Sequence, residues 1–308
     1  MNEILTALWP VFALLLLGYL ARRFDFPGEA FWEPAERATY YVLFPVLLVY
    51  KLSLADIAAV PLLDVAVAVA AILAAGSVVL LLGQRYWPVG NARFTSIYQG
   101  GIRFNTYVGL AASVALFGDS GLAAAAVVIA VMVPLLNLLC VIVFVRYAQQ
   151  EADLGKMFQA VLKNPLILAC LLGILLNLGG LGLPQPVQSV AGLLSGMALP
   201  LALLAIGAGL NLAAVRRAGH AVVYSSLVKL LFVPLVMSLI CYLFIDSYVV
   251  AAVLVLFSAL PTAPSAYILA RQLGGDAPVM AAIITCQTLL SMLTLPAILL
   301  LFMVFFPK

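Results

Sequence analysis

The chain has 308 residues, of which 66% are hydrophobic and 9% are charged, and its mean hydropathy is +1.21. A soluble domain of this size cannot bury that much apolar surface, so the composition excludes a soluble globular fold. The net charge is only +3, and the sequence has no basic arm of the kind that binds nucleic acid. These features predict an integral membrane protein.

Ten apolar segments follow one another along the chain, most of them about 20 residues long, the length that crosses a bilayer core. Glycine, proline and charged residues punctuate nearly every gap between them. The sequence therefore predicts an all-α integral membrane protein with ten transmembrane helices, at residues 4–21, 36–54, 61–83, 95–117, 121–146, 165–178, 187–209, 220–244, 248–271 and 277–305.

Basic residues distinguish the two sides of the membrane. With the N-terminus outside, the outer side holds only Lys51 and Lys308, while Arg103 and Lys229 lie within segments. Because lysine and arginine concentrate in cytoplasmic loops, we expect both termini to be extracytoplasmic. The inner side then holds Arg22, Arg23, Arg37, Arg85, Arg93, Arg146, Lys156, Lys163, Arg216, Arg217 and Arg271.

The chain divides into two halves of five segments each. Residues 1–150 form the first half, residues 151–164 a polar cytoplasmic linker, and residues 165–308 the second half. An odd number of segments per half places the second half upside down relative to the first. Leu43-Phe44-Pro45 recurs as Ala198-Leu199-Pro200, and at nearly the same spacing Gly118-Asp119 recurs as Gly275-Asp276. These matches predict an inverted five-plus-five repeat.

Segments four and nine are interrupted at corresponding places. The first reads Gly100-Gly101-Ile102-Arg103-Phe104-Asn105-Thr106, and the second reads Leu260-Pro261-Thr262-Ala263-Pro264-Ser265. A helix break within a membrane survives only where protein or water satisfies the freed backbone groups. Paired breaks in two halves indicate the substrate site of a secondary transporter. The alternative is that the two prolines simply kink a continuous helix.

These two segments, together with Tyr41-Val42-Leu43-Phe44-Pro45 and Asn164-Pro165, resemble the auxin efflux carrier family over essentially the whole chain. The chain is similar to bacterial members described as malonate or organic-anion carriers, and the resemblance extends more distantly to plant auxin exporters and bile-acid sodium symporters. It implies a scaffold of helices 1, 2, 6 and 7, and a transport core of helices 3–5 and 8–10. Helices 4 and 9 would cross at their unwound centres.

Helices that restart after a break present N–H groups and a positive dipole end, which suit a carboxylate. Asn105 and Thr262 are expected to cap the restarted helices. Arg103, deep in its segment, either binds the substrate carboxylate or snorkels towards the interface. The predicted substrate-binding residues are Arg103, Asn105, Thr106, Pro261, Thr262, Pro264 and Ser265.

Other polar residues within the segments fit a supporting role. Lys229 is either a substrate contact or a donor to freed carbonyl groups. Asn137, Gln287, Thr288 and Thr294 could help backbone carbonyls to hold a sodium ion, although such residues more often join helices. No carboxylate is expected deep in the membrane. We predict no cofactor and no metal, and the sequence leaves coupling to sodium or protons open.

The sequence contains no HExxH, GxSxG or P-loop motif, so we do not expect an enzyme. The leading hypothesis is a secondary transporter or facilitator of a small organic anion, working by alternating access in the cell's inner (plasma) membrane. The alternative is a membrane sensor or lipid-binding module on the same fold. The expected partners are the anion and the bilayer, and a homodimer remains open.

Overall fold

The computed structural model describes residues 2–55, 60–148, 163–215 and 219–306, and within these ranges every regular element is a helix. Most of the predicted linker 151–164 lies outside the described residues, as does Asp56. The first half contains α1 (Asn2–Arg23), α2 (Glu29–Ala38), the π-helix η1 (Thr39–Leu43), α3 (Phe44–Leu54), α4 (Leu62–Tyr86), α5 (Asn91–Ile102) and α6 (Thr106–Ala148). The second contains α8 (Pro165–Leu178), α9 (Gln185–Ala208), α10 (Leu212–Val215), α11 (Gly219–Leu227), the π-helix η3 (Val228–Phe232), α12 (Val233–Phe244), α13 (Tyr248–Ala259), α14 (Ser265–Gln272) and α15 (Ala277–Phe305).

The helices lie where the apolar segments predict them, with two differences in their boundaries. The second segment begins earlier than expected, because α2, η1 and α3 follow one another without a gap from Glu29. The fourth and fifth segments are separated only by a kink at Gly118, whose φ of 60° and ψ of −139° are not helical. Glycine adopts such a positive φ without the strain that a side chain would add.

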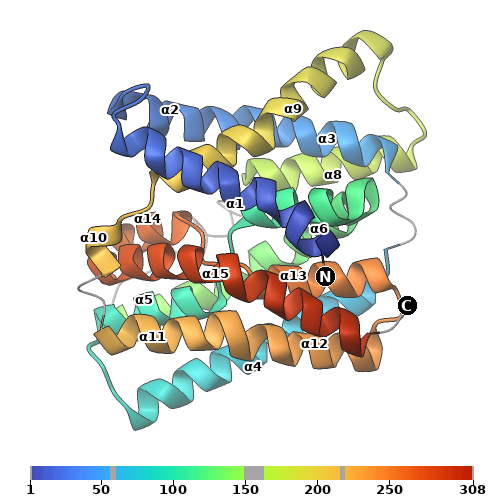
Figure 1. Cartoon of the computed structure of the whole chain (residues 1–308). Coiled ribbons are helices and arrows are strands. Elements are labelled where there is room, and N and C mark those ends of the chain that lie inside the picture. The colour runs from blue at the N-terminus through green and yellow to red at the C-terminus, as the bar shows by residue number, and fades with distance from the viewer. Residues whose placement is uncertain (1, 56–59, 149–162, 216–218, 307–308) are drawn as a thin grey trace.

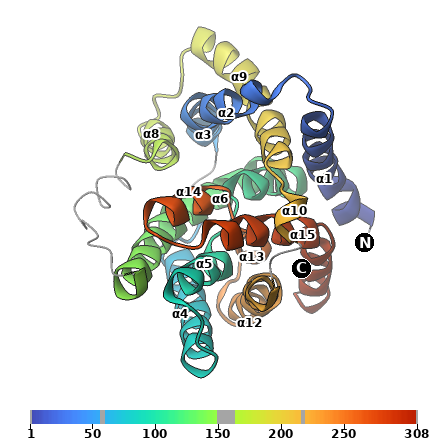
Figure 2. The same cartoon turned by 90° about the vertical axis from the view of Figure 1, so that its left-hand side faces the viewer.

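The helices form two groups (Figures 1 and 2). The first group consists of α1, α2, α3, α8 and α9, which pack against one another. The second group consists of α4, α5, α11, α12, α13, α14 and α15, together with η3. The long helix α6 contacts members of both groups, including α1, α3 and α9 on one side and α4, α5 and α13 on the other.

Glycines allow α1 and α9 to approach closely. A methyl group added at Gly18 would collide with the backbone of Leu204, and one added at Gly207 would collide with the backbone of Leu15. Small residues at such crossings are a common means of packing helices in membranes, where lipid removes the hydrophobic drive for association. The backbones of α1 and α9 are therefore in direct contact at these two glycines.

The outer surface of the molecule is strongly apolar. Large hydrophobic side chains such as Leu63, Trp87, Leu193, Leu293 and Val304 are at least 74% exposed. Among the residues that the structure describes, six helical stretches are long and apolar enough to cross a membrane, and α8 and α13 are shorter apolar helices. Because such a surface is stable only in lipid, the fold is that of an all-α membrane protein.

Candidate functional site

The first helix break separates α5 from α6. Helix α5 ends at Ile102, and Arg103 has an extended backbone with φ −72° and ψ 156°. Helix α6 begins at Thr106, and the Asn105 side chain caps it by accepting hydrogen bonds from the N–H groups of Tyr107 (3.1 Å) and Val108 (3.4 Å). Asn105 therefore occupies the capping position that the sequence indicates, and it holds the positive end of the α6 dipole at the break.

The second break separates α13 from α14 and is built differently. Helix α13 ends at Ala259, and α14 begins at Ser265 with Pro264 as its N-cap residue. Thr262 was expected to cap this helix, and that expectation is wrong. Its N–H and hydroxyl instead donate to the Oε1 of Gln287 in α15, and Thr262 lies two residues before the N-cap residue Pro264. The tie to α15 outweighs the local preference of threonine for an N-cap.

The two breaks are joined directly. The Asn105 N–H donates to the Pro261 carbonyl at 2.8 Å, and the Thr262 hydroxyl lies 2.9 Å from the Gly100 carbonyl. Gln287 completes the junction, because its Nε2 donates to the same Gly100 carbonyl at 2.9 Å while its Oε1 accepts from the Thr262 N–H at 3.0 Å. Backbone groups that both breaks free are thus satisfied inside the protein, as a membrane requires.

Several buried donors at the first break have no protein partner among the described residues. They are the Arg103 Nη1, the Asn105 Nδ2 and the side-chain amide of Gln99. Gln99 is fully buried, and it precedes Arg103 by one helical turn, so the two side chains share a face of α5. Unpaired buried donors are costly unless water or a ligand satisfies them, and these three residues lie within seven positions of one another around the first break.

Aromatic side chains surround the same break. Tyr107 of α6 stacks on Phe44 of α3 with 4.6 Å between ring centroids, so the first group of helices reaches the break here. Tyr40 of η1 lies near Arg103, whose guanidinium is also within hydrogen-bonding reach of the Cys140 thiol. The half-buried Glu36 also lies near Tyr107.

The remaining predicted residues do not all lie at the break. Thr106 is half-buried at the start of α6, Pro264 is half-buried, and Ser265 is exposed. Thr288 donates to the Ile284 carbonyl of its own helix at 2.7 Å, which leaves it a local role. The other polar residues are Asn137, which is half-buried, and Thr294 and Lys229, whose buried polar atoms have no partner among the described residues.

Four residues near the break were not found by sequence reasoning: Gln99, Tyr40, Tyr107 and Glu36. Gln99 could have been found, because it is polar within an apolar segment and lies four residues before Arg103. Tyr40 and Glu36 could not, because they come from a segment whose approach to α6 depends on how the two groups of helices dock.

Two surface cavities lie away from this junction. One, of about 530 Å³, is an apolar groove between α3 and α9, and the other, of about 310 Å³, lies among α1, α6, α13 and α15.

Within the described ranges, no three His, Cys, Asp or Glu side chains gather as they would around a metal ion. The unpaired polar atoms at the break are themselves buried, and their residues line neither groove.

An all-helical apolar chain with buried, unpaired donors at a helix break has the features of a membrane transport protein. The comparisons agree with this class. Residues 154–299 match the profile of a family described as "Membrane transport protein". An "Uncharacterized transporter" of Methanothermobacter thermautotrophicus is 27% identical over 296 residues, which cover 93% of this chain and 94% of the relative. The chain is thus similar to membrane transport proteins, over its second half by the family profile and over nearly its whole length by this relative.

Proposed function

We propose that the protein is a secondary transporter or facilitator of a small organic anion, and that the anion binds at the break between α5 and α6. The observation that carries this proposal is the set of unpaired buried donors from Gln99, Arg103 and Asn105. Donors of this kind, beside the N-terminus of α6, favour a carboxylate over a cation. The guanidinium of Arg103 can hold both oxygens of one carboxylate.

The position of the break suits alternating access. In this proposal the first group of helices, with α1, α3, α8 and α9, is the scaffold, and α6 moves with the second group as the transport core. The Tyr107–Phe44 stack then lies at the boundary between scaffold and core, directly beside the anion. A relative movement of the two bodies would expose the break first to one side and then to the other.

The proposal includes an inverted five-plus-five repeat of ten transmembrane helices. The two breaks support it, since α5 and α6 would correspond to α13 and α14 in the opposite orientation. The two breaks differ in their chemistry, however. The first carries the unpaired donors, whereas Thr262 at the second is fully bonded to Gln287 and Gly100. We therefore assign the anion to the first break and a supporting role to Thr262.

The decisive experiment is uptake of radiolabelled malonate and phenylacetate into proteoliposomes, with binding measured separately by thermal shift on purified protein. The two probes represent a small dicarboxylate and an aromatic monocarboxylate. Saturable uptake of at least one of them is expected, and the Arg103→Gln variant should lose it while keeping its fold. Binding without uptake would instead favour the alternative, a membrane sensor on the same fold.

A further inference from the structure

Lys229 lies in the π-helix η3 and is fully buried, with 0% of its surface exposed. Its Nζ atom has no hydrogen-bond partner among the described residues. No other Lys, Arg, Asp or Glu in the described ranges is buried to this degree. Single π-helical turns inside α-helices often mark functional positions.

The neighbours of Lys229 along the chain show that it lies level with the break. One turn earlier, the Ser225 hydroxyl donates to the Ile97 carbonyl of α5 at 3.3 Å. One turn later, Val233 of α12 packs on α4 beside Ile102, the last residue of α5. A methyl group added at Gly76 of α4 would lie 3.5 Å from the Val233 side chain and 3.6 Å from the Ile102 side chain. Lys229 therefore lies beside the last turn of α5, the helix whose end carries the proposed anion site.

Nothing around Lys229 offers it a negative charge. The elements that pack against η3 are α4, α5, α11, α12, α13 and α15. Their only acid is Asp64, which is exposed near the start of α4, and no Asp or Glu is buried anywhere in the described chain. The other titratable or charged residues of these elements are Arg85, Tyr86, Arg93, Tyr98, His220, Tyr224, Cys241, Tyr242, Tyr248 and Cys286, with Arg103 at the end of α5.

Burial favours the neutral amine of Lys229 in the absence of a ligand. An ammonium group without an acceptor loses its hydration and gains nothing in return. An anion bound at the end of α5 would supply the missing negative charge, so it would favour the protonated form of Lys229.

We propose that Lys229 is a proton-binding site of the carrier, which takes up one proton from solution when the organic anion binds. The neutral amine accepts the proton and becomes an ammonium ion, and no other bond forms or breaks. Loading then adds one anion and one proton together, which makes the protein a proton-coupled anion transporter. This inference rests on the proposed function, because it needs the anion at the neighbouring break.

The test is titration calorimetry of the whole protein with malonate and with phenylacetate, in two buffers of different ionisation enthalpy, at a pH where both probes are ionised. The dependence of the observed heat on the buffer gives the number of protons taken up per anion. We expect a value approaching about one for the wild type, by linkage. Lys229→Met should bind with an uptake near zero, whereas Lys163→Met, which changes an exposed lysine, should behave like the wild type.

The outcomes separate the two proposals. Binding by the wild type without proton uptake would overturn the role of Lys229 and leave the transporter assignment standing. If neither probe binds, the proposed function fails, and the role of Lys229 fails with it. The half-buried Glu36 is the other group that could receive the proton. Uptake that persists in Lys229→Met and disappears in Glu36→Gln would assign the proton to that carboxyl and refute the inference.

Discussion

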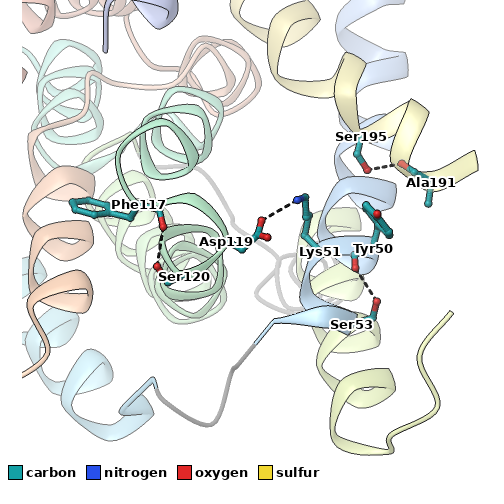
Figure 3. A network of polar contacts seen from close by, with 8 residues as sticks. All are labelled: Tyr50, Lys51, Ser53, Phe117, Asp119, Ser120, Ala191 and Ser195. Atoms are coloured by element: carbon teal, nitrogen blue, oxygen red, sulfur yellow. Dashed lines mark hydrogen bonds and ion pairs between the residues drawn. The ribbon is translucent and has the colours of Figure 1, made fainter. Parts of the chain in front are cut away.

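The Nζ atom of Lys51 lies 2.9 Å from the Oδ1 of Asp119, which follows the kink at Gly118 (Figure 3). Lys51 belongs to α3 in the first group of helices, and Asp119 belongs to α6. The pair therefore joins the two bodies whose relative movement the proposed alternating access requires. Both side chains are substantially exposed, at 35% and 68%, so solvent screens the attraction and the pair contributes about 0.2–1 kcal/mol.

Removing this ion pair should change the balance between conformations without unfolding the protein. We expect Lys51→Ala and Asp119→Ala to change the transport rate by roughly fivefold at most, since about 1 kcal/mol corresponds to that factor. The exchanged pair, Lys51→Asp with Asp119→Lys, should return the rate towards that of the wild type. Initial uptake rates in proteoliposomes measure this. If the exchanged pair transports no faster than either single variant, the attraction between the two charges does not control the transport rate.

Locking the same contact should stop transport. In a Cys286→Ser background, the Lys51→Cys/Asp119→Cys variant should be cross-linked by a short thiol reagent and then lose uptake, which reduction should restore if the linker is a disulfide. Cys140, Cys170 and Cys241 are buried, so they should not react. The single-cysteine variants treated in the same way are the controls. Full uptake by the cross-linked protein would show that α3 and α6 do not separate during transport.

Asn105 has two functions that a single substitution can separate. Its Oδ1 caps α6, whereas its Nδ2 has no partner in the described chain. Asn105→Ser keeps a capping oxygen and removes the amide donor, so it should bind the anion more weakly with little loss of stability. Asn105→Ala should in addition lose about 1 kcal/mol of stability. Binding of malonate or phenylacetate and melting temperature are the two measurements. Equal affinity in the wild type and Asn105→Ser would exclude the amide from the site.

Gln99 and Gln287 are both fully buried, yet we expect opposite effects from the same substitution. Gln99→Leu removes polar atoms that have no protein partner, so the fold should be as stable as before or more so, while anion affinity falls. Gln287→Leu leaves the Thr262 N–H without its partner and should cost about 1–3 kcal/mol. Thermal unfolding and binding, measured on both variants, distinguish the ligand contact from the structural one. A destabilised Gln99→Leu would contradict this assignment.

The orientation in the membrane has its own test. The distribution of basic residues predicts that Lys51 and Asp119 face the outside and that Arg146 and Arg271 face the cytoplasm. In intact cells, a membrane-impermeant maleimide should therefore label Lys51→Cys and Asp119→Cys, and should label Arg146→Cys and Arg271→Cys only after lysis. All four positions are at least partly exposed. The reverse pattern of labelling would invert the predicted topology.

The sequence by itself determined the class of protein, the helices and the place of the first break. The thickness of the bilayer sets the length of the apolar segment that crosses it. Because such a segment is visible in the local sequence, the helices could be located without any knowledge of how they pack. Asn105 could be placed as a cap because capping depends on a few neighbouring backbone groups.

Only the tertiary structure decided which polar groups are already bonded to protein and which are left for a ligand. Thr262 has the sequence signature of an N-cap, but its N–H and hydroxyl donate to the side chain of Gln287, 25 residues away. Lys51 and Asp119, 68 residues apart, meet because α3 docks against α6. Such partners depend on how helices distant in sequence approach one another, and no local pattern in the chain encodes that approach.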